Sequence, residues 1–171
     1  YKEGKSGKLV FVVVSHEIFK TEQLAIREEH DIVYREGADS NKLPPTSKPA
    51  PEGALWSRNI TPDPVLLFRY SALTFNGHRI HYDLPYVRDE EGYPGLIVHG
   101  PLIATLLMDL CSRERPNSTL ANFSYRAICP LFDIEPFSVN GVPKDDQKSA
   151  SLWAASNSGV LAMQAEAIFK D

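Results

Sequence analysis

The sequence predicts an α+β fold in which an antiparallel sheet curls around one long apolar helix. A run of ~15 residues from Pro101 to Pro116 has helical character, with a proline at each end. Leu102, Ile103, Leu106, Leu107 and Leu110 cover more of this helix than a narrow stripe, so other structure must surround it. Strand-like runs separated by turn signals follow it to the end of the chain. With 171 residues and 43% hydrophobic content, the chain can bury a sizeable core.

The first 37 residues predict a β-hairpin that belongs to a separate, incomplete domain. Leu9 to Ser15 is rich in β-branched residues, and Leu24 to Tyr34 alternates between polar and apolar side chains. Such a hairpin is rarely stable alone. Residues 38–55 contain four prolines with polar spacers, which is typical of a linker, and residues 56–171 form the second domain.

The second domain begins with a short helix over Asp63 to Leu73, with Pro64 in its first turn. We expect Leu66, Phe68, Tyr70 and Leu73 to face a core in part, and Thr74 to Asp83 to form a polar turn. The three strand-like runs after the long helix are separated by the turn signals NGVPKDD and SNSG; they are Leu120 to Leu131, Glu135 to Val139 with Ser149 to Asn157, and Val160 to Phe169.

Charge and cysteine content exclude several classes of protein. A net charge of -4 without a basic block argues against a nucleic-acid or anionic-lipid surface. Cys111 and Cys129 are too few for a disulfide framework and indicate a reducing compartment. The N-terminal apolar run has only strand length and no cleavage pattern. We therefore expect a cytoplasmic protein, or a mitochondrial matrix protein if the source is eukaryotic.

Two neighbouring motifs carry the candidate chemistry. Asn76, His78, Arg79, His81 and Tyr82 lie within seven positions, and His99-Gly100-Pro101 opens the long apolar helix. An imidazole near the mouth of a helix indicates acid/base chemistry beside a carbonyl-binding helix N-terminus. The sequence has no Gly-rich phosphate loop, no Cys/His set at zinc spacing and no Gly-x-Ser-x-Gly elbow, and no metal site is expected.

These residues resemble the hotdog fold of the MaoC-like, R-specific enoyl-thioester hydratases. The family loop reads Asp-x-Asn-Pro-(Ile/Leu)-His-x-Asp, and residues 76–83, Asn-Gly-His-Arg-Ile-His-Tyr-Asp, match its spacing and retain the final His and Asp. Asn76, His78 and Arg79 replace the family's first Asp, its Asn and its Pro. This variant is similar to a narrower branch that contains mesaconyl- and itaconyl-CoA hydratases and type-2 3-hydroxyacyl-thioester dehydratases.

In that branch two hotdogs lie in one polypeptide, and the N-terminal hairpin resembles the last strands of the first. The resemblance therefore implies the C-terminal half of a double hotdog, with residues 56–171 as the catalytic hotdog. It also implies pairing of the sheet edge, either in a homodimer or with another hotdog.

The resemblance implies a hydro-lyase that adds or removes water across the Cα=Cβ bond of an acyl-CoA thioester, with a short dicarboxylyl-CoA of the itaconyl or mesaconyl type as first choice. His81 is then the acid/base, Asn76 positions water, and the Gly100 N–H holds the thioester oxygen. The expected substrate-binding residues are His78, Arg79, Tyr82, His99 and Arg126. No cofactor is implied beyond the coenzyme A of the substrate.

Several roles stay open. His78 supplies a second proton if residues 76–81 form a helical turn, and otherwise is a structural hydrogen-bonder. Asp83 either holds the His81 ring in one tautomer or caps a turn. Arg79, Arg126 and the loop lysines Lys144 and Lys148 are candidates for anionic groups of the ligand, Arg79 before the others.

Rival functions remain beside the leading one. A 3-hydroxyacyl-thioester dehydratase of fatty-acid synthesis would use the same chemistry with a long apolar tunnel. A non-catalytic acyl-thioester binding module is compatible with Asn76 in place of the family's aspartate. A thioesterase is the third, because other hotdog proteins hydrolyse the thioester.

Overall fold

The structure is a computed structural model that describes residues 2–4, 7–35 and 47–170. It divides into two compact units, Tyr1–Pro45 and Thr46–Asp171. Residues 38–46 of the predicted linker lie outside the described residues.

The N-terminal unit contains the predicted hairpin, with longer strands than expected and a short first strand that was not predicted. Strand β1 spans Lys2–Gly4, β2 spans Gly7–Lys20 and β3 spans Gln23–Arg35, in the order β1-β2-β3 with antiparallel neighbours. The pairing of β2 and β3 continues through polar residues because opposite charges face each other across the strands. Glu17 lies opposite Arg27 and binds it at 2.8 Å, and His16 lies opposite Glu28 at 2.9 Å.

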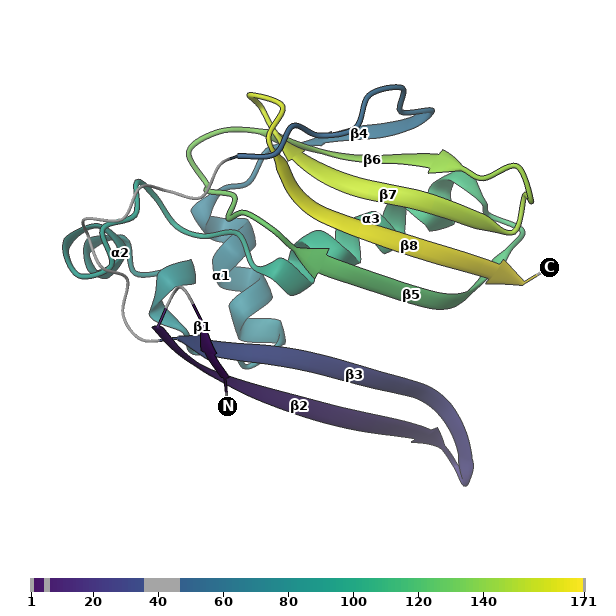
Figure 1. Cartoon of the computed structure of the whole chain (residues 1–171), viewed down its shortest axis with the longest axis horizontal. Helices are drawn as coiled ribbons and strands as arrows, with labels where there is room; N and C mark the ends of the chain where they lie inside the picture. The colour runs from purple at the N-terminus through teal and green to yellow at the C-terminus, as the bar shows by residue number, and fades with distance from the viewer. Residues whose placement is uncertain (1, 5–6, 36–46, 171) are drawn as a thin grey trace. The chain divides into compact units, whose positions relative to one another are not determined.

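The C-terminal unit is a five-stranded antiparallel sheet in the order β4-β6-β7-β8-β5, with helix α3 against one face (Figure 1). The strands are β4 (Trp56–Ile60), β5 (Thr119–Ala127), β6 (Phe137–Pro143), β7 (Ser149–Ser156) and β8 (Leu161–Lys170). Helix α3 spans Gly100–Glu114 and contacts all five strands. This arrangement confirms the predicted sheet curled around one long helix.

The core forms between α3 and the sheet. The helix buries one broad face there, made of Leu102, Ile103, Ala104, Leu107, Leu110 and Cys111. They pack in one core with residues of the strands, among them Val139, Leu152 and Met163. Pro101 and Pro116 flank the helix as predicted, because proline fits the first turn and cannot continue the last.

Helix α1, which spans Pro64–Leu73, faces the core differently from the prediction. Leu66 and Tyr70 pack partly against the core as expected, whereas Phe68 and Leu73 are exposed, and Leu67 and Ser71 are the buried residues. The apolar residues of this helix surround it, so hydrophobicity alone does not choose a side. The buried side of the helix is the one that carries Ser71, whose hydroxyl contacts the buried His99 ring.

Two strand assignments also differ from the prediction. Strand β4 was not expected, and it forms because Trp56 lies opposite Gly141 of β6, where a glycine leaves room for the indole ring. The NGVPKDD segment does not turn at Asn140. The Asn140 amide accepts a hydrogen bond from Ser57 Oγ and donates one to Ser138 Oγ, both at 2.8 Å, so a buried polar residue is tolerated inside β6. The turn begins at Lys144.

The described part of the predicted linker is held against the C-terminal unit. The Leu161 N–H donates to the Lys48 carbonyl at 2.8 Å, and the Ala50 N–H donates to the Gly159 carbonyl at 2.9 Å. Residues 47–55 therefore lie along the sheet. Across the described ranges, we find no helix with the length and apolar character needed to cross a membrane.

Candidate active site

The loop between α1 and α3 folds into a short helical turn that carries the candidate imidazole. The 3-10 helix η1 spans Arg79–His81, and α2 spans Leu84–Asp89. Asn76 Oδ1 accepts a hydrogen bond from the His78 N–H at 3.0 Å, and the Tyr82 hydroxyl donates to the Gly77 carbonyl at 2.8 Å. Both side chains thus hold the loop, and the predicted water-positioning role of Asn76 stays a prediction.

Hydrogen bonds of the strand-like segment before α3 fix His81. The Ile97 N–H donates to the Ile80 carbonyl at 3.0 Å, and the Ile97 carbonyl lies 2.7 Å from His81 Nδ1. A carbonyl oxygen only accepts, so Nδ1 carries the proton and neutral His81 keeps an unprotonated Nε2. This nitrogen has no hydrogen-bond partner among the described residues. His81 therefore presents a base.

His81 is 7% exposed, and this burial lowers its pKa. The hydrogen bond to Ile97 opposes the shift, and the charge of a protonated His78 adds to it. The His78 and His81 rings lie 5.8 Å apart at 85°. The structure therefore brings His78 beside His81 on one turn, as the i, i+3 argument required, with His78 itself exposed.

His99 lies behind His81 and not at a ligand surface. The two rings stack with centroids 3.6 Å apart and an interplanar angle of 16°. His99 is 0% exposed, so it offers no surface to a substrate, contrary to the role predicted for it. Its Nε2 lies 2.8 Å from Ser71 Oγ of α1. Burial lowers the pKa of His99 to about 4, with a smaller contribution from His81, so His99 stays neutral at pH 7.

The stacking brings His81 next to the N-terminus of α3, because Gly100 directly follows His99. His99 makes no side-chain cap to this helix, and Pro101 has no N–H. The Gly100 N–H therefore points out of an uncapped helix end, where the helix dipole favours negative charge. A Cβ added to Gly100 would meet no heavy atom within 4 Å, so the position that a side chain would take is open.

A cavity of about 290 Å³ borders this helix mouth. Gly100 and Ile97 form part of its wall, and the wall is otherwise apolar apart from the thiol of Cys129. The wall includes Ile103 of α3, Met163 of β8, and Leu131 from the segment between β5 and β6. The shape and lining suit an acyl chain whose carbonyl oxygen reaches the Gly100 N–H.

The charged residues of the loop are engaged with each other. Arg79 binds Asp83 Oδ2 through Nε and Nη2 at 2.9 and 2.8 Å, and its guanidinium lies 4.0 Å over the Tyr86 ring. Asp83 also accepts the Tyr86 N–H at 3.2 Å and caps α2. The capping alternative for Asp83 is therefore confirmed, and the Ile97 carbonyl fixes the tautomer instead.

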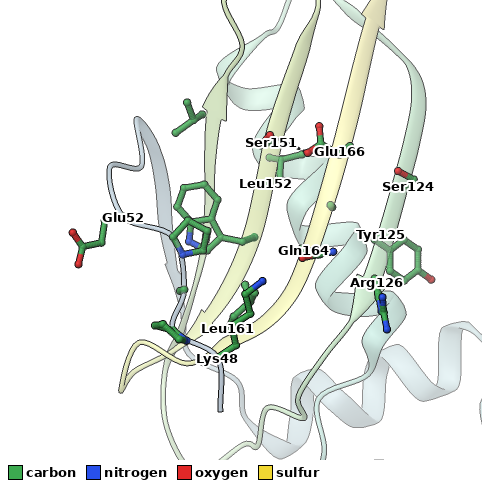
Figure 2. A pocket seen from close by; sticks show the side chains of 16 residues that line it. Lys48, Glu52, Ser124, Tyr125, Arg126, Ser151, Leu152, Leu161, Gln164 and Glu166 are labelled. Carbon is green, nitrogen blue, oxygen red and sulfur yellow. Dashed lines mark hydrogen bonds between the residues drawn. The ribbon is translucent and has the colours of Figure 1, made fainter. Parts of the chain in front are cut away.

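Arg126 lies at another cavity, of about 760 Å³, on the sheet next to residues 48–52 (Figure 2). Arg126 and Tyr125 come from β5, and Gln164 and Glu166 come from β8. Neither the histidines nor Gly100 line this cavity. The structure therefore does not place Arg126 in the wall of the cavity beside Gly100. Lys144 pairs with Glu166.

Residues that the sequence interpretation missed support the histidine pair. Ser71 is a polar residue four positions after the buried Leu67, and this spacing could have indicated a buried polar contact. The Ile97 carbonyl has no sequence signal, because every residue has one. Among the described residues no three His, Cys, Asp or Glu side chains gather as metal ligands would.

Known proteins share both the sequence and the fold of this chain. Residues 2–133 match the family of hydroxyacyl-thioester dehydratases, type 2. Mesaconyl-C(4)-CoA hydratase of Chloroflexus aurantiacus is 49% identical over 96% of this chain and 58% of its own length. The mitochondrial hydroxyacyl-thioester dehydratase type 2 of Schizosaccharomyces pombe is 32% identical over 75% of this chain and 43% of its own length. The chain thus spans about half the length of these relatives.

Solved structures show the hotdog fold. HtdX from Mycobacterium tuberculosis matches 98% of this chain and 64% of its own with a TM-score of 0.70 at 17% identity. The MaoC-like dehydratase from Phytophthora capsici matches 100% of this chain and 59% of its own, also at 0.70, with 15% identity. The (R)-hydratase from A. caviae matches 74% of this chain and 98% of its own at 0.60, with 18% identity. By the span of residues 2–133 and these two relatives, the chain belongs to the type-2 hydroxyacyl-thioester dehydratase family.

Proposed function

We propose that this chain carries the active site of a hydro-lyase that adds or removes water across the Cα=Cβ bond of an acyl-CoA thioester. The observation that carries the proposal is the stacking of His81 on His99, which brings a base next to the uncapped Gly100 N–H. Gly100 and Ile97, which binds the His81 ring, line the apolar cavity, whereas His81 itself does not. The names of the two relatives, a hydratase and a dehydratase, describe the two directions of this reaction.

In hydration, His81 Nε2 takes a proton from water, and the oxygen of that water forms a bond to Cβ. The electron pair of the Cα=Cβ bond moves toward the thioester carbonyl, whose oxygen becomes an enolate oxygen. The Gly100 N–H and the positive end of α3 stabilise this charge. Cα then accepts a proton, either from the imidazolium of His81 or from His78 beside it. Dehydration is the same sequence reversed. No cofactor takes part in these steps.

The lowered pKa of His81 suits the first step. A base has to be unprotonated before it accepts a proton, and burial keeps His81 neutral at pH 7. The stacked His99 is neutral as well, so it adds no charge that would oppose the imidazolium formed during the reaction.

For the substrate we propose a short acyl group, with a dicarboxylyl-CoA of the itaconyl or mesaconyl type as first choice. A cavity of about 290 Å³ accommodates a short chain, and the relative with 49% identity is a mesaconyl-C(4)-CoA hydratase. No described residue puts a cation in the cavity wall. The free carboxylate is therefore expected outside the apolar wall; Arg79 on η1 is exposed but is paired with Asp83.

The apolar wall favours a second candidate, a 3-hydroxyacyl-thioester dehydratase that acts on uncharged acyl chains. Burying a charged carboxylate without a partner is unfavourable, whereas an alkyl chain makes apolar contacts with Ile103, Leu131 and Met163. Substrate profiling separates the two candidates. The dicarboxylate assignment predicts higher kcat/KM for mesaconyl- or itaconyl-CoA than for crotonyl-CoA, and the reverse order supports the second candidate.

The testing experiment follows the enoyl-thioester absorbance of a panel of enoyl-CoAs mixed with the protein. We expect turnover by the unchanged protein and a loss of ~10²–10⁴-fold in kcat for His81→Ala, because this removes the general base. His30→Ala on β3 is the matched control, since His30 is an exposed histidine of the N-terminal unit. Binding without absorbance change would support a binding module, and release of free thiol would support a thioesterase.

We further propose that the N-terminal unit represents the end of a first hotdog and that the sheet of the C-terminal unit pairs with another hotdog. The support is that HtdX and the P. capsici dehydratase match nearly the whole chain, hairpin included, and are longer than it. Other neighbours of the same fold were solved as the ChsH1-ChsH2 complex and the HadBC complex. Both cysteines are free, which suits a reducing compartment such as the cytoplasm or the mitochondrial matrix.

A further inference from the structure

A buried imidazole that the proposed reaction does not use lies behind the candidate base. His99 has contacts on three sides: Ser71 Oγ at 2.8 Å, the stacked His81 ring at 3.6 Å, and the Tyr70 ring at 4.9 Å in an edge-on arrangement. Its side chain is 0% exposed, so it reaches neither solvent nor a substrate.

This imidazole carries a cost that a hydrocarbon ring would avoid. His99 Nδ1 is a buried polar atom with no hydrogen-bond partner among the described residues. Burying a polar atom without a partner is unfavourable, and a phenyl ring would fill similar space without one. A histidine at this position therefore needs a compensating role. The bond to Ser71 of α1 indicates that role, because only a ring with a polar atom can be prevented from rotating by a hydrogen bond.

We propose that His99 is a positioning residue, whose ring is oriented by Ser71 and in turn holds the plane of the His81 ring. This inference rests on the proposed function. The His81 ring then has two independent restraints: the Ile97 carbonyl fixes its rotation by binding Nδ1, and the stacked His99 fixes its tilt. Together they aim the unprotonated Nε2 in one direction, which is what proton transfer to and from a bound substrate requires.

The groups that face His81 make its titration a direct readout of the stack. His78 faces it from its own loop, and His99 faces it from the residue before α3. Tyr70 and Ser71 of α1 contact His99 and complete the surroundings. Among the described residues no carboxylate contributes to the shift at His81; burial is its largest cause, and the His99 ring supplies part of that burial.

The variants are His99→Phe, His99→Ala and Ser71→Ala. His99→Phe keeps a ring to stack on His81 but loses the anchor to Ser71, His99→Ala removes the stack, and Ser71→Ala removes the anchor alone. We expect His99→Ala to lower kcat by ~10- to 100-fold with KM within about threefold, since the base is misaligned and not lost. His99→Phe and Ser71→Ala keep a stacked ring but lose its anchor, so each should lose part of the activity, and less than His99→Ala does.

The titration of His81 reports whether a ring still stacks on it, separately from turnover. We expect the acidic limb of kcat/KM, and the His81 pKa followed by ring NMR, to rise toward 6.5 in His99→Ala because water replaces the stacked ring. In His99→Phe the pKa should stay low. Exposed His30 is the internal reference in each spectrum.

Two outcomes would overturn the inference. One is His99→Ala with the turnover and the His81 titration of the unchanged protein. The other is His99→Phe impaired as much as His99→Ala in both measurements, which would show that stacking is not what matters. If His99→Ala fails to fold, His99→Phe and Ser71→Ala still decide the question. If the unchanged protein turns over no enoyl-CoA, the proposed function fails, whereas the NMR titration still tests the His81–His99 coupling.

Discussion

At the scale of single residues, this protein assigns neighbouring histidines different tasks through burial. His78 is exposed, His81 is nearly buried, and His99 is fully buried and neutral. Three imidazoles that lie within a few ångströms of their neighbours therefore differ: one is solvated, one is a base with a lowered pKa, and one is an uncharged ring that stacks on that base. The sequence places all three near each other but does not reveal which is which, because burial depends on packing.

Acid should unfold the protein partly through His99. The pKa of this residue is about 4 in the folded chain against ~6.5 unfolded, so the unfolded chain binds more protons between these values. Its contribution is complete above pH 6.5 and is lost as the pH falls to 4, and it amounts to roughly 3 kcal/mol. His81 acts in the same direction. Denaturant unfolding at pH 7 and pH 4.5 should show the loss.

His99→Phe supplies the comparison for this measurement, because a phenyl ring cannot take up a proton. Its free energy of unfolding should fall less between pH 7 and pH 4.5 than that of the unchanged chain. Equal losses in the two proteins would contradict the assignment of the acid sensitivity to His99.

Gly100→Ala separates folding from substrate approach. The added methyl group meets no protein atom within 4 Å, and alanine is favoured over glycine in a helix by ~0.5–1 kcal/mol. The free energy of unfolding should therefore stay the same or rise. Gly100 lines the cavity, and the added methyl group narrows it where the proposed thioester approaches, so kcat/KM for an enoyl-CoA should fall about tenfold or more. Unchanged activity would show that the thioester does not approach Gly100.

At the scale of elements, boundaries were predictable where a residue has one physical meaning. Proline at both ends defined α3, and Asp63 before Pro64 defined the start of α1. The facing of α1 was not predictable because its apolar residues surround the helix. Strand β4 escaped prediction because only Trp56 and Ile60 at its ends are buried, and its pairing depends on β6.

The pairing of β4 with β6 should fail when Gly141 gains a side chain. A Cβ there would lie 2.9 Å from Trp56 Cε3 and 2.9 Å from Leu152 Cδ2, closer than packed side chains allow. We expect Gly141→Ala to lower the free energy of unfolding by ~1–3 kcal/mol, the usual cost of overpacking. Gly77→Ala, whose Cβ meets nothing within 4 Å, is the control. Equal stability of the two variants in denaturant titrations would contradict this account.

At the scale of the whole molecule, the candidate site lies entirely in the C-terminal unit. His81, His99, Gly100 and the cavity of about 290 Å³ all belong to Thr46–Asp171. The linker composition and the motif positions in the sequence predicted that the site lies in the second unit. It could not predict that the carbonyl of Ile97 orients His81, since a backbone group becomes specific only when the fold brings it there.

The sheet has two edge strands, β4 and β5, and we expect β5 to be the one that pairs. Strand β5 bonds only β8 among the described residues, and an unpaired edge strand offers its backbone to another sheet. We expect the protein to sediment as a dimer in analytical ultracentrifugation and the double change Asn122→Lys with Ser124→Lys on β5 to shift it toward monomer. Asn59→Lys on β4 is the control. A dimer that the β5 change leaves intact would place the contact elsewhere.

The backbone origin of the restraint on His81 has a practical consequence. No substitution at position 97, apart from one that distorts the main chain, deletes the oxygen that holds the ring, yet Ile97 is also a residue of the cavity wall. Replacing Ile97 by valine or alanine should therefore widen the cavity for longer substrates and leave the hydrogen bond to His81 Nδ1 in place. Substrate selectivity can then be changed at this position without changing the base.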